Sequence, residues 1–295
     1  MFSSFFKVQS LGNDFILFDW QLKKESKYRQ ILQNPEWKKF VINSCNRNFS
    51  IGANGILILL KNQKLNIPQV LIFNSDGSQA KICLNGIRCI AHYLHSNYNF
   101  SKNFKIKIGN QIIECKIINK KNELEIINSM KPGQYIEIKT ITILNQKFTG
   151  HIVNVGNPHF LVFQKKDIKY LKKYGPLIEN YKYFKNKTNV EFVWQKDNKP
   201  SPRLQFINKN NFNMIVYERG CGITLACSSG AYALVTTLYY LKKIKINEKI
   251  IIHMPGGNIS CWVTNNKKIN IQAKAHIIFK GKYCQDILFK INSIL

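Results

Sequence analysis

The sequence predicts an α+β protein made of two similar domains, and three observations lead to this fold class. A chain of 295 residues is long enough to form two domains, each with its own core. Short motifs recur at a constant distance along the chain, which indicates a duplicated domain. Each copy combines strand-like segments with one helical run that directly follows a Cys-x-x-Gly sequence.

The duplication has a period of 144 residues. Residues 11–16 (LGNDFI) resemble residues 155–160 (VGNPHF), and residues 83–86 (CLNG) resemble residues 227–230 (CSSG). The distance from 12 to 156 and the distance from 83 to 227 are both 144, and the same shift carries Asn74 onto Glu218. One such match would mean little, but matches in register over about seventy positions indicate two copies of one domain.

The elements follow the same order in both copies. A Gly-Asn turn precedes an apolar strand, at residues 16–18 in the first copy and 160–163 in the second. The helical runs are 87–94 and 231–238, and the second is apolar on nearly every side, which predicts a buried central helix. Residues 104–118, and in part 249–263, alternate apolar and polar side chains as strands do. We place the domain boundary near 128–133, where Pro132-Gly133 interrupts the pattern.

The composition excludes several classes of protein. With 45% apolar and 12% aromatic residues the chain is typical of globular proteins, and no apolar stretch is long enough to span a membrane. The N-terminus lacks the pattern of a secretion signal, so we expect a cytoplasmic protein. The net charge of +28 is spread along the chain together with many Asn and Ile residues. We interpret this charge as compositional drift, with nucleic-acid binding as the alternative.

Two of the eight cysteines differ from the others. Without a secretion signal, an even number of cysteines does not indicate disulfides, and no spacing gives a Cys-x-x-Cys pair or a zinc-finger pattern, so we expect no metal site. Cys83 and Cys227 stand out because the repeat places each at the start of a helix. The default interpretation, a small buried apolar residue, fits Cys45, Cys115, Cys261 and Cys284.

A thiol at a helix N-terminus meets free backbone N–H groups and the positive end of the helix dipole, which predicts a pKa below its usual value of about 8.5. The same N–H groups can hold a carboxylate. For one such site, a buried structural cysteine is the simpler interpretation. Two matching sites favour a two-base reaction, in which one thiolate removes a proton from a carbon beside a carboxylate and the other thiol protonates the opposite face. The sequence therefore predicts an amino-acid racemase or epimerase that needs no cofactor.

At these motifs the chain resembles the diaminopimelate epimerase family. The matching motifs lie between Gly12 and Gly281 and include residues 11–15 (LGNDF), 73–78 (FNSDGS), 156–159 (GNPH), 189–192 (NVEF), 217–220 (YERG) and 226–227 (AC). The resemblance implies an isomerase that interconverts L,L- and meso-diaminopimelate for lysine and cell-wall synthesis, without cofactor or metal. It also implies two pseudo-symmetric domains, 1–127 with 276–295 and 128–275. Each would be a β-barrel-like sheet wrapped round a central helix, with the active site in the cleft between them.

The resemblance assigns a role to each matching residue. Cys83 and Cys227 would be the two bases, assisted by His159 and Glu218. Glu218 would also meet the distal ammonium group of the substrate, and Arg219 would bind the distal carboxylate. The other substrate-binding positions, through side chains or backbone amides, would be Asn13, Asn74, Asn85, Gly86, Asn157, Asn189, Ser228 and Ser229. A small-molecule substrate is the partner implied; no nucleic acid or membrane is expected, and a homodimer is left open.

Some residues depart from the family pattern. Leu84 stands where glycine is usual, so its side chain could crowd the carboxylate seat or forbid a positive φ. Ser228 also replaces a glycine, which is a milder change. Between 46 and 55 the family favours Asp, His and Asp at three places that are Asn46, Asn48 and Asn54 here. These changes bear on rate and stability more than on the type of reaction.

Several alternatives stay open at this point. Asn13 and Asn157 could simply close turns, His159 could be a packed core residue, and Glu218 with Arg219 could form a surface ion pair. A racemase of another amino acid, such as proline, is the nearest alternative on the same fold. A degenerate, non-catalytic basic protein that binds nucleic acid is the alternative from a different class.

Overall fold

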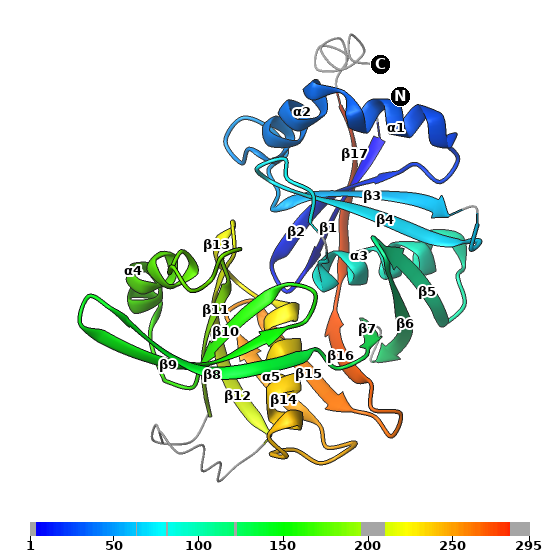
Figure 1. Cartoon of the computed structure of the whole chain (residues 1–295). Helices are drawn as coiled ribbons and strands as arrows, with labels where there is room; N and C mark the ends of the chain where they lie inside the picture. Colours follow the sequence, from blue (N-terminus) through cyan, green and yellow to red (C-terminus); the bar gives the residue numbers. More distant parts are fainter. Residues whose placement is uncertain (1–3, 63, 81, 121–122, 196–209, 284–295) are drawn as a thin grey trace. The chain divides into compact units, whose positions relative to one another are not determined.

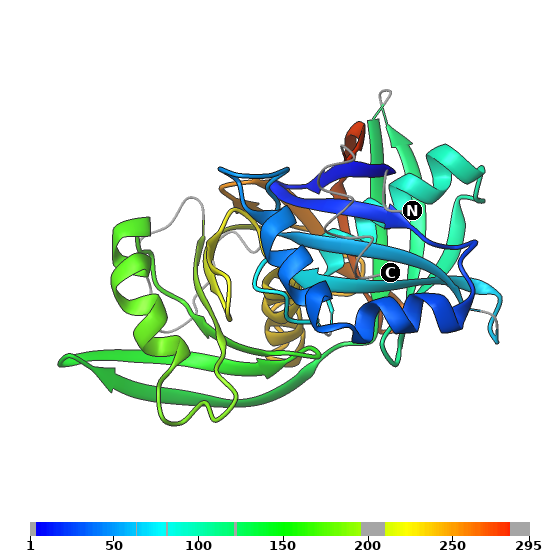
Figure 2. The same ribbon diagram turned by 90° about the horizontal axis from the view of Figure 1, so that it is seen from above.

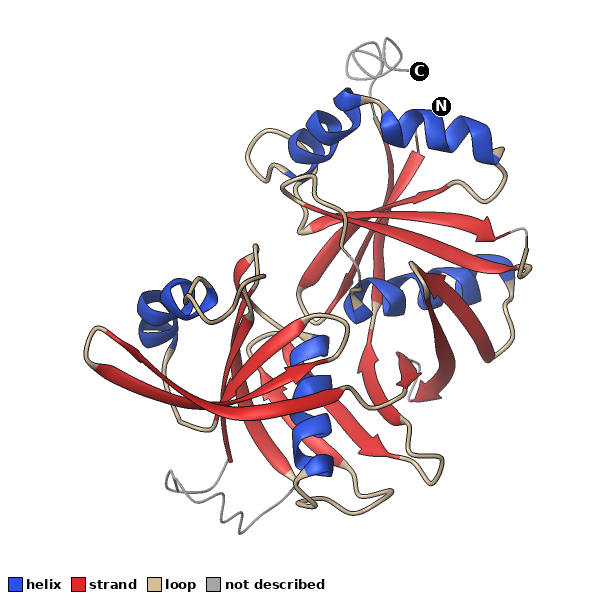
Figure 3. Ribbon diagram, viewed as in Figure 1, coloured by secondary structure: helices blue, strands red, loops and turns tan. Residues whose placement is uncertain are grey.

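The computed structural model describes residues 4–62, 64–80, 82–120, 123–195 and 210–283. The chain divides into two compact units, residues 1–126 with 274–295 and residues 127–273. Strands predominate over helices in both units, as Figure 3 shows, and the chain has the predicted α+β class. Cys284 lies outside the described residues.

The first unit is built on a mixed sheet whose strands lie in the order β17, β1, β2, β3, β4, β5, β6 (Figure 1). The pairs β2–β3 and β4–β5 are parallel, and the other pairs are antiparallel. The strands are β1 (Ser4–Ser10), β2 (Asn13–Asp19), β3 (Gly55–Asn62), β4 (Ile67–Asn74), β5 (Asn103–Ile108), β6 (Gln111–Lys120) and β17 (His276–Lys282). β7 (Glu123–Met130) crosses the boundary between the units.

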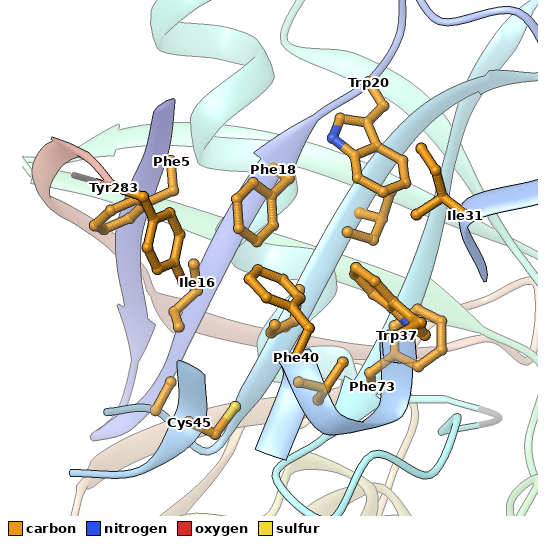
Figure 4. Close-up of a cluster of buried hydrophobic side chains, with 14 of the residues drawn as sticks. Phe5, Ile16, Phe18, Trp20, Ile31, Trp37, Phe40, Cys45, Phe73 and Tyr283 are labelled. Carbon is orange, nitrogen blue, oxygen red and sulfur yellow. The ribbon is translucent and has the colours of Figure 1, made fainter. Parts of the chain in front are cut away.

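Helices pack on both faces of β3 because its side chains alternate between the two sides. Ile56, Ile58 and Leu60 belong to an aromatic-rich cluster with α2 (Pro35–Cys45), which Figure 4 shows. In Figure 2, α1 (Glu25–Gln33) and α2 lie in front of β3 and β4. Leu57, on the opposite face, lies against Gly86 of α3 (Leu84–Tyr98). The helix α3 contacts β1, β3, β4, β6 and β17, so the sheet curves around it.

The second unit repeats this arrangement. Its strands lie in the order β8, β9, β10, β11, β12, β14, β15, β16; β10–β11 and β12–β14 are parallel, and the short β13 pairs with β12. The strands are β8 (Gln134–Ile143), β9 (Gln146–Asn154), β10 (Pro158–Val162), β11 (Asn189–Gln195), β12 (Asn211–Glu218), β13 (Gly222–Thr224), β14 (Ile250–Met254), β15 (Gly257–Val263) and β16 (Ile269–Lys274).

Two helices cover the faces of this second sheet. The helix α4 (Ile168–Glu179) begins at Asp167, whose side chain accepts a hydrogen bond from Tyr170 N, and packs against β8, β11, β12 and β13. The helix α5 (Ser228–Tyr240) contacts β8, β9, β10 and β15 and is buried along nearly its whole length, so the predicted central helix is confirmed. β4 and β12 begin and end 144 residues apart, as do the first residues of α3 and α5. The duplicated domain predicted from the motifs is therefore present.

No helix in the described ranges is long and apolar enough to cross a membrane. Within the same ranges, no group of three or more His, Cys, Asp or Glu side chains is placed to hold a metal ion.

Candidate active site

Cys83 is the residue that begins α3. It has extended backbone angles, φ −150° and ψ 104°, and its carbonyl accepts the first helical hydrogen bond, from Ile87 N at 3.0 Å. The side chain is half-buried. Arg88, one turn further along, is fully buried and donates to Asn85 Oδ1 and, at 3.0 Å, to Ser10 Oγ. These contacts fix the first turn of α3 to the end of β1.

The sequence Cys-x-x-Gly begins both central helices for a packing reason. A Cβ on Gly86 would lie 2.9 Å from Leu57 Cδ2, and a Cβ on Gly230 would lie 2.9 Å from Glu191 Oε1. Glycine therefore lets the first turn of each helix approach the neighbouring strand. Leu84, the departure from the family pattern, has a normal negative φ as the first residue of α3, and its side chain is buried. No positive φ is needed at Leu84, so the leucine side chain is compatible with the backbone there.

Cys227 begins α5 in the same way, but its surroundings are more polar. Its Sγ accepts a hydrogen bond from Gly230 N at 3.3 Å and lies 3.2 Å from Ser229 Oγ. The side chain is buried. Burial, together with the carboxylates of Glu218 and Glu191, raises the pKa of Cys227 well above its usual value, against the smaller effects of Ser229 and Gly230 N. The lowering of the pKa predicted from the helix terminus is therefore wrong for Cys227.

Glu218 lies at the end of β12, close to Cys227. Its carboxylate accepts a hydrogen bond from Thr224 Oγ1 at 2.5 Å, and burial raises the pKa of Glu218, while its hydrogen bonds and His159 oppose that effect. The side chain is half-buried and faces the protein interior. An ion pair on the surface with Arg219, one of the open alternatives, is not the arrangement found for Glu218.

His159 is a fully buried residue of β10. Its Nδ1 lies 2.6 Å from Oε1 of Glu191, and its Nε2 lies 3.1 Å from Oδ1 of Asn157. Asn157 Nδ2 in turn lies 3.5 Å from Ser229 Oγ, which contacts the thiol of Cys227. A continuous chain of polar contacts therefore runs from Glu191 to Cys227. His159 is packed in the core and is also connected to the thiol.

Asn189 and Arg219 are held by each other and by the backbone. Asn189 Oδ1 accepts from Arg219 N at 2.9 Å, and Asn189 Nδ2 donates to Pro158 O at 2.8 Å. Arg219 NH1 donates to Asn186 O at 3.1 Å. Glu179 of α4 supports the same turn, because its Oε1 accepts from Gly220 N at 2.8 Å. Asn189 is thus a buried residue that positions the turn carrying Arg219.

The asparagines of the first unit lie on turns at strand ends. Asn13 follows the two-residue turn between β1 and β2, and its Oδ1 is buried with no hydrogen-bond partner in the described residues. Asn74 ends β4 and donates through Nδ2 to Ser78 Oγ at 3.0 Å. The buried acceptor on Asn13 is the kind of group that a ligand donor would satisfy.

Known proteins similar to this chain fall into two groups. The first group is similar in sequence: the family model described as diaminopimelate epimerase matches residues 5–134 and 151–276. The chain belongs to the diaminopimelate epimerase family. A diaminopimelate epimerase of Carboxydothermus hydrogenoformans is 32% identical over 292 residues, which cover 95% of this chain and 98% of that protein. One of Prochlorococcus marinus (strain NATL1A) is 31% identical over 306 residues, with 96% and 99% covered.

The second group shares the fold of the diaminopimelate epimerase family at low sequence identity. A hydroxyproline epimerase from Agrobacterium vitis has a TM-score of 0.74 at 11% identity, covering 95% of this chain and 90% of that chain. A probable proline racemase from Agrobacterium radiobacter K84 has a TM-score of 0.72 at 10% identity, covering 96% and 93%. At these identities the likeness establishes the fold alone.

Three residues that contact the candidate site of this diaminopimelate epimerase family member were not predicted from its sequence. Glu191, Glu179 and Arg88 contact residues of the candidate site, yet none of them repeats at the period of 144. For Glu191 a signal existed, because it is an acidic residue inside the apolar run Val190 to Val193. An acidic residue at such a position is either paired or functional.

Proposed function

We propose that this chain epimerises L,L-diaminopimelate to meso-diaminopimelate by a two-base mechanism, with Cys83 and Cys227 as the two acid–base residues. The observation that carries this proposal is the pair of thiols, each on the N-cap residue directly before a repeat-related helix, in a member of the diaminopimelate epimerase family. A single cysteine at a helix start has a structural explanation, whereas two in equivalent positions match the two faces of one carbon.

In the proposed reaction one thiolate takes the α-proton and the other residue, as a thiol, delivers a proton to the opposite face. The electron pair left on the α-carbon spreads into the adjacent carboxylate, and backbone N–H groups at the first turns of α3 and α5 stabilise that charge. Protonation then restores the neutral α-carbon with inverted configuration, and the first base keeps the proton it removed. No electron sink outside the protein is part of this scheme.

The distal end of the substrate would be recognised in the second unit. Arg219 provides a guanidinium for the distal carboxylate and Glu218 a carboxylate for the distal ammonium group. The turn that carries both is held by Asn189 and Glu179. The buried Oδ1 of Asn13 offers an acceptor for a substrate N–H group. We place the reaction in lysine and cell-wall precursor synthesis in the cytoplasm, with a small molecule as the only partner required.

The test is solvent deuterium incorporation into the α-carbon of L,L- and of meso-diaminopimelate, with conversion followed by chiral chromatography. We expect wild-type protein to exchange and invert both isomers, and Cys83→Ala and Cys227→Ala each to lose inversion by about 100-fold or more. Cys261→Ala is the matched control, since Cys261 is a buried thiol of β15. It should keep wild-type turnover.

Three outcomes would contradict the proposal. Wild-type turnover in both site variants would exclude the two-thiol mechanism. Exchange of proline but not of diaminopimelate by the wild-type protein would favour a racemase of another amino acid. Salt-dependent retention on DNA with no exchange into any of these substrates would support the non-catalytic alternative.

A further inference from the structure

One buried pair of side chains is apolar in the first unit and polar in the second. In the first unit, the parallel pair β2–β3 places Leu17 beside Leu57; in the second, β10–β11 places Leu161 beside Glu191. Leu17 and Leu161 are 144 residues apart, so Leu57 and Glu191 occupy equivalent positions. The same shift carries Phe15 onto His159. The first unit therefore has Phe and Leu where the second has His and Glu.

This difference is not required by folding. Phe15 and Leu57 are buried in the first unit, which shows that the fold accepts an apolar pair here. His159 and Glu191 are both 0% exposed, and burying such groups costs free energy unless every polar atom is paired. One carboxyl oxygen of Glu191, Oε2, has no hydrogen-bond partner within the described residues. The His–Glu pair thus lowers stability relative to the apolar pair, which points to a role in function.

The position of Glu191 indicates what that role is. Its Oε1 occupies the place beside Gly230 that Leu57 Cδ2 occupies beside Gly86, so a carboxylate lies against the first turn of α5. A negative charge there offsets the dipole of the helix, which otherwise favours a thiolate at its N-terminus. From Glu191, contacts through His159, Asn157 and Ser229 lead to the thiol.

We propose that Glu191 is a positioning residue for the Cys227 thiol: it holds His159 in place and, through its charge, keeps Cys227 protonated in the unliganded enzyme. The first unit has no carboxylate at the equivalent position, so the two thiols are not equivalent. This assignment rests on the proposed function, and it makes Cys227 the acid of the resting enzyme. Glu191 acts through its neighbours and through space, without itself reaching the substrate.

The other charged groups around Cys227 are consistent with this assignment. Glu218 from β12 and Glu191 from β11 both raise the pKa of Cys227, while His159 from β10 acts on Glu218. The titratable groups of β8 and β9 packed near this helix, Tyr135 and His151, lie at its other end beside Tyr240. Glu218 remains in place when Glu191 is changed, so its effect is separable.

The test compares three variants. Glu191→Gln removes the charge and keeps the shape, and the double variant His159→Phe with Glu191→Leu installs the pair found in the first unit. Thr237→Val is the control, because Thr237 is a buried polar residue whose hydroxyl donates to Ala233 O, toward the other end of α5 from the thiol. We expect the double variant to fold with a melting temperature equal to or above that of the wild type.

The main measurement is the pH dependence of the rate of Cys227 alkylation by iodoacetamide without substrate, resolved by peptide mass spectrometry from about pH 7 to about pH 11. We expect the Cys227 midpoint to move to lower pH by about one unit in both Glu191 variants and to stay unchanged in Thr237→Val. The Cys83 midpoint should not move.

Activity provides the second measurement. The double variant should show a lower kcat with little change in KM, because substrate-binding groups are left intact. If both Glu191 variants fold and the Cys227 midpoint equals that of the wild type, the proposal is wrong. Failure of the proposed function would appear differently, as a wild-type protein that exchanges no diaminopimelate proton; the alkylation profiles would still decide the role of Glu191.

Discussion

At the scale of single residues, the departures from the family pattern have local explanations. Leu84 fits because the first residue of a helix needs no positive φ and the leucine side chain finds a place in the core. Asn54 accepts hydrogen bonds as a carboxylate at this position would: its Oδ1 accepts from Asp14 N at 3.1 Å and from Arg47 NH2 at 3.3 Å. Asn46 caps the following turn, accepting from Asn48 N and Phe49 N. These amides keep the hydrogen bonds of the loop while reducing its negative charge.

A first prediction concerns Leu11, two residues before the candidate site residue Asn13. Leu11 has φ 55° and Gly12 has φ 78°, in a two-residue hairpin turn that favours Asn-Gly. We expect Leu11→Asn to raise the free energy of unfolding by about 1 kcal/mol, because leucine is strained in this conformation. Urea denaturation of the variant measures the effect.

Leu144→Asn is the matched control for that variant. Leu144 has φ 47° in the two-residue turn between β8 and β9 and is 65% exposed, so the substitution changes backbone preference with little loss of packing. A gain in stability for Leu144→Asn but a loss for Leu11→Asn would mean that packing of the half-buried Leu11 outweighs its strain. A loss for both would contradict the turn assignment.

At the scale of helices and strands, the elements that could be predicted are those that local sequence determines. The helices after the two thiols and the strands at 104–118 follow from periodicity and from the repeat, and all are present. The pair His159–Glu191 could not be predicted, because it depends on the parallel register of β10 and β11, which are separated by α4. For the same reason the high pKa of Cys227 was missed: burial and carboxylates from distant strands outweigh a local helix terminus.

A second prediction concerns His151, which joins β9 to β8 through Tyr135. Burial lowers the pKa of His151 to about 4, from 6.5, and Tyr135 Oη lies 2.9 Å from its Nδ1. The unfolded chain takes up a proton near pH 6.5 whereas the folded protein does not, so stability falls as the pH falls from about 6.5 to about 4. Between pH 7 and pH 5 we expect His151 to account for a loss of about 1 to 2 kcal/mol.

Urea denaturation at both pH values tests this. His151→Gln keeps an acceptor for Tyr135 and should show a smaller loss between pH 7 and pH 5 than the wild type. His253→Gln, which makes the same substitution at a half-buried histidine of β14, is the matched control. Equal pH dependence in all three proteins would refute the assignment to His151.

At the scale of the whole molecule, each unit takes its edge strand from a different place in the chain. In the second unit β8 pairs with β9, which directly follows it. In the first unit the equivalent strand beside β1 is β17, which comes after the whole of the second unit. The sequence repeat alone does not show that β17 belongs to the sheet of the first unit, since β17 has no sequence motif that links it to β1. The resemblance to the family supplied the assignment of the C-terminal segment to the first domain.

A third prediction concerns Tyr283, directly after β17. Its ring contacts those of Phe5, Phe18 and Phe40 (Figure 4). Its hydroxyl donates to Ser44 Oγ at 2.9 Å. We expect Tyr283→Ala to lower the free energy of unfolding by about 3 to 5 kcal/mol through the cavity it leaves. Tyr283→Phe loses only the hydrogen bond and should cost about 1 kcal/mol.

Hydrogen exchange locates the effect of the Tyr283 variants. In Tyr283→Ala, amides of β1 and β2 should lose protection while those of β10 and β11 keep it, because the altered cluster belongs to the first unit. Equal loss in both units would show that they unfold as one cooperative block.

The late position of β17 has a consequence for how the protein is made. During translation the second unit can complete its sheet once its last strand has left the ribosome, whereas the first unit, although synthesised earlier, must wait until β17 has been made. Until then β1 offers an open edge that another nascent or unfolded chain could occupy. Premature termination near residue 275 would therefore damage the half of the enzyme that was translated first.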